Sequence, residues 1–260
     1  MNRFMHRWGR HLIVAVLAVA LVKGLSAADA PEPVSVSNYA PAEDLMAQAD
    51  FFMERLAESL ESADSYTIAS KARVQKDANT MIVLLMGLGL HDQDNRVKAA
   101  APALIAQAKK VAESYDDYQA TKTAFDALAE GFTSGSATGG EPLEWKPYFA
   151  LGQVMKQVTL INNRLRLGVQ ERNFERRLQD SAGYSATLGL IGQVAVTDTH
   201  EVKDEANLPQ WYGFAIEMRD AAGAVNKAVH DKDLAAATAA FERLNKNCND
   251  CHAVFRKDLL

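Results

Sequence analysis

The sequence predicts an all-α protein in which an N-terminal signal segment precedes two tandem antiparallel four-helix bundles. Apolar residues recur at helical spacing, as at Leu45, Phe52 and Leu56, and no sustained run has the two-residue period of a strand. Eight helical segments with short connections fall into two sets of four, and each set has roughly the 100 residues of a bundle. The 260 residues are 48% hydrophobic and 23% charged, which is typical of a globular protein.

The N-terminus has the pattern of an export signal. Three arginines precede an apolar run at 12–22, and small residues follow at 26–28. The run is shorter than the roughly 20 residues that span a membrane. We therefore expect residues 1–28 to be a cleaved signal peptide that directs the chain to the periplasm, with an uncleaved membrane anchor as the alternative.

Proline and glycine mark the expected domain boundaries. Residues 29–41 contain three prolines and are expected to be a linker, and residues 132–142, with three glycines, are expected to join the two bundles. The bundles then occupy 42–131 and 143–260. Helices are expected at 42–63, 66–90, 94–114 and 117–131 in the first bundle, and at 143–168, 171–196, 208–229 and 233–257 in the second.

The two halves resemble each other in sequence. Residues 117–128 align with residues 233–244, with identities at Asp117, Ala120, Ala124, Phe125 and Leu128 of the first segment. A weaker similarity pairs residues 86–88 with residues 188–190. These matches indicate an internal duplication, and the alternative is chance similarity between alanine-rich helices.

The charge distribution argues against nucleic acid as a partner, and it differs between the two halves. A net charge of −5 disfavours nucleic-acid binding, which relies on basic side chains. Residues 29–142 contain 18 acidic and nine basic side chains, whereas residues 143–260 contain 15 of each. The negative first half either steers a basic partner or keeps the protein soluble, and solubility is the simpler interpretation.

The motif with the clearest chemistry lies near the C-terminus, at Cys248-Asn249-Asp250-Cys251-His252. This C-x-x-C-H spacing is the attachment signature of c-type haem. Residues three and four apart share a helix face, so both thiols can add to the vinyl groups of one porphyrin while the imidazole reaches its iron. We expect one covalent haem c, with His252 as the metal ligand.

Other uses of the two cysteines have weaker support. A zinc site needs about four ligands, and the sequence has no second C-x-x-C motif or paired histidines to complete one. A thioredoxin-type dithiol would lie beside a βαβ unit, which the pattern does not indicate. A disulfide between Cys248 and Cys251 within one helix would be strained.

The residues from Cys248 to Arg256, which read C-x-x-C-H-x-x-Phe-Arg at the end of the last helix, resemble the cytochrome c′ family. The similarity covers about 143–260 and is strongest over 208–257. It implies a left-handed four-helix bundle with one covalent haem, thioether anchors at both cysteines and His252 as proximal ligand. It places Arg256 near the proximal face of the haem. Family members leave the sixth iron position open, bind nitric oxide or carbon monoxide or pass electrons in the periplasm, and often form dimers, so a homodimer is a further expected partner.

The distal residue is less well defined by the sequence. The family often has an arginine in its first helix, and residues 148–160 contain none. The apolar candidates at core spacing are Leu151, Val154, Met155 and Val158. We choose Met155, although a methionine on an apolar face is ordinarily core packing. Ligation by Met155 would make the iron six-coordinate and favour electron transfer.

The remaining histidines and two of the tryptophans are interpreted as structural. His91, His200 and His230 lie at expected helix ends or in loops, where histidine is common without function. Each is kept as an alternative second axial ligand. Trp145 and Trp211 are expected to be packing residues rather than electron conduits.

The first half is expected to lack haem. The alignment of the halves places Phe132, Gly135 and Ser136 where the motif has Cys248, Cys251 and His252, so neither anchors nor ligand remain. A haem-sized void would be costly, at about 24 cal/mol per Å³. The large apolar residues expected to fill this volume are Phe51, Phe52, Met53, Met81, Leu84, Leu85 and Met86.

Three functions follow from these observations. The first is a periplasmic haem protein that binds a diatomic gas, and the second is an electron carrier with a second axial ligand such as Met155. Electron transfer would be helped by a basic rim around the motif, which could dock a redox partner and would consist of Arg243, Lys246, Arg256 and Lys257. The third is a partner-binding module with structural haem. The protein is interpreted as a non-enzyme, because a peroxidase needs polar distal groups and the sequence offers no distal acid–base pair.

Overall fold

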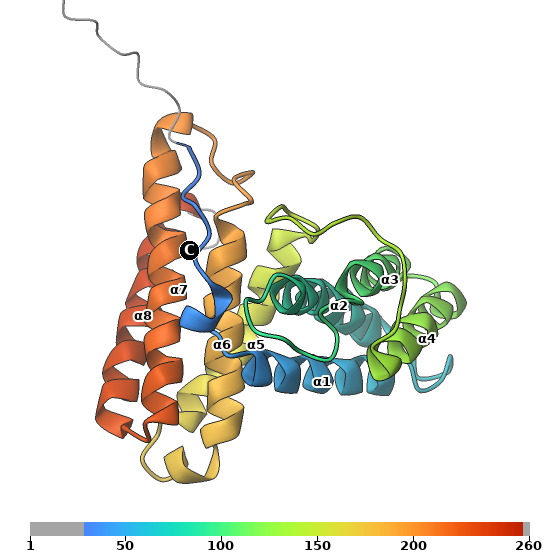
Figure 1. Cartoon of the computed structure of the whole chain (residues 1–260), viewed down its shortest axis with the longest axis horizontal. Coiled ribbons are helices and arrows are strands. Elements are labelled where there is room, and N and C mark those ends of the chain that lie inside the picture. Colours follow the sequence, from blue (N-terminus) through green and yellow to red (C-terminus); the bar gives the residue numbers. More distant parts are fainter. Residues whose placement is uncertain (1–28, 257–260) are drawn as a thin grey trace, which may run out of the picture.

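A computed structural model describes residues 29–256, and within this range the chain forms eight α-helices, three short 3-10 helices and no strands (Figure 1). The prediction of an all-α fold is confirmed. The expected signal peptide and Lys257 lie outside the described residues. No helix within 29–256 has the length and apolar composition needed to cross a membrane. The helices are α1 (Ala42–Ser59), α2 (Ile68–Gly89), α3 (Ala101–Glu113), α4 (Tyr118–Ser134), α5 (Leu151–Gly168), α6 (Leu178–Ala195), α7 (Leu208–His230) and α8 (Leu234–Phe255).

Local signals explain most helix starts. The side chains of Thr67, Asp117 and Asp233 each accept a hydrogen bond from the backbone N–H three residues later. The third helix was expected from 94 but begins at Ala101, because Pro102 is tolerated only in a first helical turn.

The fifth helix also differs from its expected position. It was expected from 143 but begins at Leu151. Pro147 disfavours a helical conformation at Lys146, which accounts for the absence of helix before the proline. The fourth helix continues to Ser134 and ends at Gly135, whose φ of 63° is the left-handed conformation that glycine adopts at low cost. The non-helical connection between the halves therefore covers residues 135–150 rather than 132–142.

The two halves pack on each other through their first two helices. In Figure 1, α6, α7 and α8 lie on the left and α1 to α4 on the right. Helix α1 contacts α6, α2 contacts α5, and α2 also contacts α6. A two-fold axis that exchanged α1 with α5 and α2 with α6 would produce this pairing. The interface therefore has the isologous pattern of a symmetric dimer within one chain, as an internal duplication predicts.

The C-terminal part of α2 and most of α6 are buried on all sides because they lie at this interface. Every residue from 77 to 88 in α2 and from 181 to 195 in α6 is buried. The two helices approach closely at Gly87, where an added Cβ would lie 2.4 Å from a methyl group of Leu190. The similarity of residues 86–88 to residues 188–190 thus falls where equivalent helices of the two halves meet.

The interior of the first half is filled as the sequence predicts. Phe52, Met81, Leu84, Leu85 and Met86 are fully buried, Met53 is buried, and Phe51 is partly buried against the same core. Phe132, which aligns with the first cysteine of the motif, is buried as well. The methionine-rich stretch is therefore core packing.

The prediction that residues 29–41 form a linker is wrong for the last part of this segment. Its last part forms a 3-10 helix at Val36–Asn38, and Val36, Tyr39 and Ala40 are buried. Tyr39 packs where α6 and α7 carry Gly189 and Gly223, whose missing side chains leave room for its ring. These residues pack against the second half, so only residues 29–35 of the segment lie outside the core.

Candidate haem site

The motif lies in the last two turns of α8, and its three functional side chains share one face. Cys248, Cys251 and His252 line a cavity of about 300 Å³ between α5, α7 and α8. Met155 of α5 lines the same cavity from the facing wall. The structure therefore brings together four of the five site residues that the sequence analysis selected.

The facing wall narrows the choice of distal residue. Met155 and Val158 line the main cavity, and Leu151 lines a smaller cavity beside it. Val154 is fully buried and lines neither. Helix α5 thus presents two apolar side chains to the motif, and Met155 contributes to both cavities. Helix α7 supplies the remaining wall with Trp211, Phe214, Ala215 and Met218.

The protonation states of the motif suit haem attachment. Burial and the nearby Arg256 charge lower the pKa of His252, so its imidazole is neutral and has a lone pair for a metal. Burial raises the pKa of Cys248, and it raises the pKa of Cys251 to about 11. Both groups are therefore thiols near neutral pH, unlike the low-pKa cysteines of redox-active dithiols.

The cavity wall also contains an unpaired polar atom. Asn162 Nδ2 donates to Asn245 Oδ1 at 2.9 Å, whereas Asn162 Oδ1 is buried without a hydrogen-bond partner. This oxygen is an acceptor, so it is not a partner for haem, whose polar propionates are acceptors too. The site fits a haem through its donor set, with two thiols and an imidazole on one wall opposite the apolar Met155 and Val158.

Arg256 lies at the smaller cavity with His252 and Met155. Its Nη1 donates to Glu201 Oε1 at 3.2 Å, and the two side chains are 27% and 28% exposed. Glu201 belongs to the connection between α6 and α7, 55 residues away in sequence. No local sequence pattern relates a loop glutamate to a distant arginine, so the sequence did not predict this partner.

Aromatic packing fixes the end of α8. The Phe255 ring meets the Trp211 ring edge-on, with centroids 5.1 Å apart, and lies 6.2 Å from the Phe214 ring. Trp211 is buried and its indole N–H donates to the Ala195 carbonyl at 2.8 Å. Trp211 is therefore a packing residue that also forms part of the cavity wall.

Asn247 is a second residue that the sequence analysis missed. It directly precedes Cys248, is buried, and its Nδ2 donates to the Phe214 carbonyl of α7 at 2.9 Å. This bond fixes the rotation of α8 against α7 and so orients the motif toward the cavity.

Asn247→Ala is expected to lower the free energy of unfolding by about 1 kcal/mol, because it removes the buried hydrogen bond from α8 to the Phe214 carbonyl of α7. Urea denaturation followed by circular dichroism would measure this. Asn249→Ala is the matched control, since Asn249 is exposed two residues further along α8. Equal losses in both variants would contradict the role given to Asn247.

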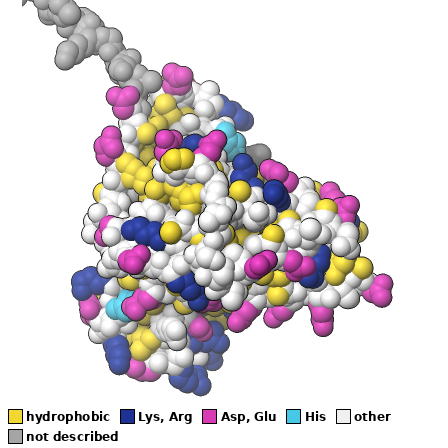
Figure 2. Space-filling view, turned by 45° about the vertical axis from the view of Figure 1, so that its right-hand side comes forward, with side chains coloured by type: hydrophobic (Ala, Val, Ile, Leu, Met, Phe, Trp, Pro, Cys, Tyr) yellow, Lys and Arg dark blue, Asp and Glu magenta, His cyan; other side chains and the backbone are white. Residues whose placement is uncertain are grey.

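The expected basic rim is neutralised wherever the structure describes it. Arg243 pairs with Glu217, Lys246 with Asp250, and Arg256 with Glu201. On the face shown in Figure 2, basic and acidic side chains are interspersed rather than gathered by sign. These pairs leave little net positive charge around the motif to attract an acidic redox partner.

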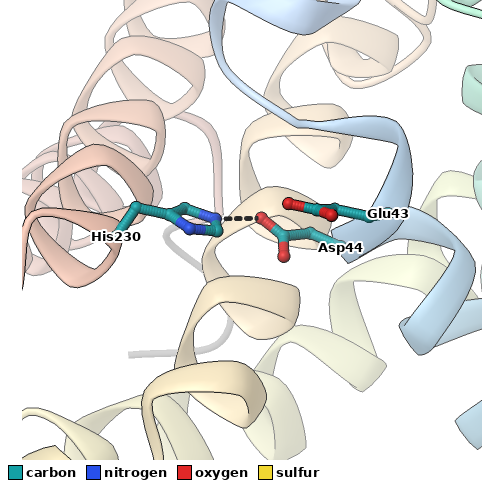
Figure 3. A group of neighbouring side chains, drawn as sticks. All are labelled: Glu43, Asp44 and His230. Atoms are coloured by element: carbon teal, nitrogen blue, oxygen red, sulfur yellow. Dashed lines mark hydrogen bonds and ion pairs between the residues drawn. The ribbon is translucent and has the colours of Figure 1, made fainter.

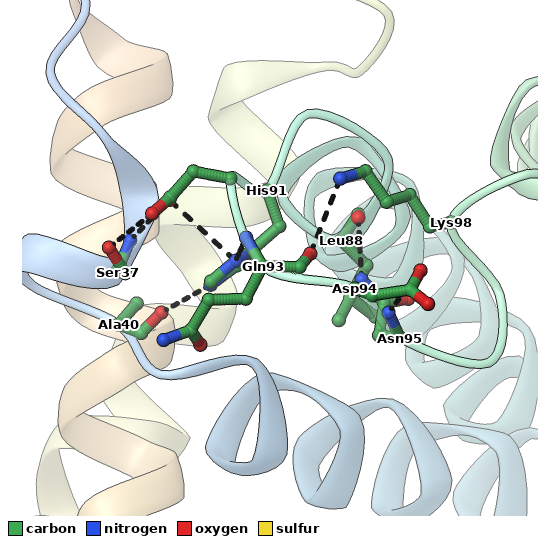
Figure 4. Close-up of polar contacts among 9 residues, drawn as sticks. Ser37, Ala40, Leu88, His91, Gln93, Asp94, Asn95 and Lys98 are labelled. Carbon is green, nitrogen blue, oxygen red and sulfur yellow. Dashed lines mark hydrogen bonds and ion pairs between the residues drawn. The ribbon is translucent and has the colours of Figure 1, made fainter.

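His91 is engaged at the contact between the first half and residues 36–40, away from the haem site (Figure 4). Its Nδ1 accepts a hydrogen bond from the Gln93 backbone N–H at 3.0 Å, so its Nε2 carries the proton and donates to the Ala40 carbonyl at 2.9 Å. Both ring nitrogens are therefore used, and His91 has no free atom for a metal.

His200 and His230 are each paired with an acidic side chain. His200 Nδ1 lies 2.5 Å from Asp198 Oδ1, and this hydrogen bond raises the pKa of His200. His230 Nε2 lies 2.8 Å from Asp44 Oδ2, with Glu43 beside it (Figure 3). Asp44 lies in the first turn of α1 and His230 in the last turn of α7, so this contact joins the two halves at their helix ends.

Comparison with known proteins agrees with this site. The family model for Cytochrome C' matches residues 210–256, which run from the first turn of α7 through the motif to Arg256. Comparison of the chain with curated proteins and with solved structures gave no match. The C-terminal part of the chain, residues 210–256, is therefore similar to the cytochrome c′ family, and this match supports a c-type cytochrome with a haem cofactor.

Proposed function

We propose that the protein is a periplasmic c-type cytochrome that carries one covalent haem c and binds nitric oxide or carbon monoxide at an open sixth iron position. The observation that supports this most directly is the cavity, which has both cysteines and His252 on one wall and the apolar Met155 and Val158 on the other. Export of the chain by residues 1–28 is part of the proposal.

Each group in the site has a defined task. Cys248 and Cys251 would anchor the haem through thioethers, and the neutral imidazole of His252 would ligate its iron. Haem iron with a single imidazole ligand supplies a vacant coordination position for a diatomic gas. Met155 and Val158 keep water away from that side of the cavity. The Glu201 carboxylate holds Arg256 beside the proximal side of the site.

The polar part of the lining supports gas binding over peroxide chemistry. The polar side chains at the main cavity, apart from Cys248, Cys251 and His252, are Thr159, Asn162, Asn163, Asn245, Asn247 and Asn249. Amides and an aliphatic hydroxyl do not ionise near neutral pH, whereas peroxide cleavage uses a distal acid–base group. The main cavity therefore suits the binding of a small apolar ligand.

Electron transfer is the second candidate, because Met155 and His252 both line the two cavities. A thioether ligand opposite the imidazole would close the sixth position and raise the reduction potential. A third candidate is a module in which the haem is structural and the acidic first half binds a protein partner or a second copy of the chain.

Optical spectra of the chain, matured with haem-attachment machinery, separate these candidates. We expect one haem per chain, in a high-spin ferrous state that takes up carbon monoxide. A low-spin spectrum that Met155→Leu converts to high spin would favour electron transfer. Two haems per chain would contradict the haem-free first half, and a chain without haem would contradict the whole proposal.

A further inference from the structure

We propose that the haem-free first half positions the distal wall of the haem site, and that Asp77 and Asn79 of α2 are the positioning residues. This inference rests on the proposed function, because the wall that they hold is the one facing His252. It assigns a task to the first half, in which the motif positions have been replaced by Phe132, Gly135 and Ser136.

Two hydrogen bonds connect α2 to α5 across the interface between the halves. The Ala150 backbone N–H, one residue before α5 begins, donates to Asn79 Oδ1 at 2.7 Å, and this bond is partly buried. Gln157 Nε2, two turns further along, donates to Asp77 Oδ1 at 2.8 Å. Asp77 is 0% and Gln157 1% exposed, so water does not compete for the second bond.

Met155 lies between the two attachment points. Helix α5 turns Met155, Val158 and Asn162 to the cavity, a spacing of three and four residues that forms one face. The same helix turns Gln157 and the buried Ile161 toward the rest of the core. The two bonds therefore hold the same two turns of α5 that carry the distal side chain.

Helix α5 also packs on α6 of its own half. On the cavity side, a described hydrogen bond to α8 runs from Asn162 to Asn245, about two turns beyond Met155. Among the described residues, the hydrogen bonds from residues 150–158 to other helices are the two to α2. Since the cavity separates α5 from α8 near the motif, the position of Met155 depends on the packing of α5 on α6 and on these two bonds to the first half.

The acceptor on α2 is itself rigid. Arg55 of α1 donates to both carboxylate oxygens of Asp77, at 3.0 and 3.2 Å. The Arg55 guanidinium also lies over the Phe51 and Phe52 rings, 5.6 and 6.0 Å from their centroids. A bidentate ion pair fixes the orientation of the carboxylate, so Gln157 meets an acceptor that the first half has already oriented.

The test measures carbon monoxide association with the ferrous holoprotein after flash photolysis, together with the ferric spin state. Asn79→Ala removes the acceptor for the Ala150 N–H, and Gln157→Met removes the donor to Asp77 with little change of shape. We expect each variant to speed association by about threefold or more, because Met155 is no longer held over the open face of the site. If Met155 ligates the iron, the same variants are expected to raise the high-spin fraction.

Asn95→Ala is the matched control. Asn95 also lies in the first half and makes two hydrogen bonds to backbone, with Leu88 as acceptor and Val97 as donor, but it does not contact α5. We expect this variant to lose stability while its association rate and spin state stay as in the wild type. A merely structural role of Asn79 would give Asn79→Ala and Asn95→Ala the same kinetics.

The outcomes separate this inference from the proposed function. A chain that carries no haem overturns both. A chain that carries haem, and whose Asn79→Ala and Gln157→Met variants match the wild type in association rate and spin state, overturns the inference alone. If Asn79→Ala fails to fold, Gln157→Met decides the question, because its substitution lies in the second half and leaves the Arg55–Asp77 pair intact.

Discussion

Replacing both Cys248 and Cys251 by alanine is expected to abolish covalent haem attachment. The two thiols lie on one face of α8 and line the same cavity wall as His252, so they are the groups placed to form thioethers there. Without them, any haem would be held by His252 and apolar contacts alone and would be extracted by acidified organic solvent. Haem staining after denaturing electrophoresis and intact mass would both show the loss.

Asp250→Ala is the control for this experiment. Asp250 lies between the two cysteines but is exposed and pairs with Lys246 on the outer side of α8. We expect this variant to retain the full haem content and the mass of one attached haem. Haem that stays covalently bound after both cysteines are removed would contradict the assignment of the motif.

Gly192→Ala is expected to cause a large loss of stability in the second half. A Cβ at this position in α6 would lie 2.5 Å from the Arg219 backbone nitrogen and 2.8 Å from the Ala215 carbonyl oxygen of α7. Backbone atoms cannot rotate away as a side chain can, so the two helices must separate. We expect the free energy of unfolding to fall by about 3 kcal/mol, the upper end for overpacking.

Chemical denaturation of the holoprotein would measure this, with Gly213→Ala as control. Gly213 is an exposed helical glycine with no atom within 4 Å of an added Cβ. Alanine there is expected to leave stability unchanged or to raise it by about 0.5–1 kcal/mol through helix propensity. Because Ala215 also lines the cavity, Gly192→Ala is further expected to change the haem spectrum, whereas Gly213→Ala is not. Equal stability of the two variants would contradict this prediction, because it would mean that α6 and α7 separate without loss of stability.

The pairing of α1 with α6 and of α2 with α5 places the first half against the back of the helix that faces the motif. The first half has no C-x-x-C-H motif and contacts the second half through pairs such as Asn79 with Ala150. Under the internal duplication that the sequence indicates, we expect the role of the first half to lie at this interface rather than at a cofactor.

Much of the protein was predictable from local sequence. Helical periodicity and the capping residues Asp117 and Asp233 located most helices, because they act within a few residues. The spacing of Cys248, Cys251 and His252 required a common helix face, and the structure places all three on one cavity wall. These properties follow from covalent geometry and the period of the helix, which the sequence alone determines.

The remaining features depend on which helix faces meet across the fold. Periodicity could not choose among Leu151, Val154, Met155 and Val158, because all four are apolar and only the packing of α5 between α2 and the cavity separates them. Glu201 meets Arg256 from a loop 55 residues away, and Asp77 meets Gln157 across 80 residues. The burial of Tyr39, in a segment with the composition of a linker, likewise depends on α6 and α7. Such contacts form only when distant segments exclude water together, so the tertiary structure, and not the local pattern, decided them.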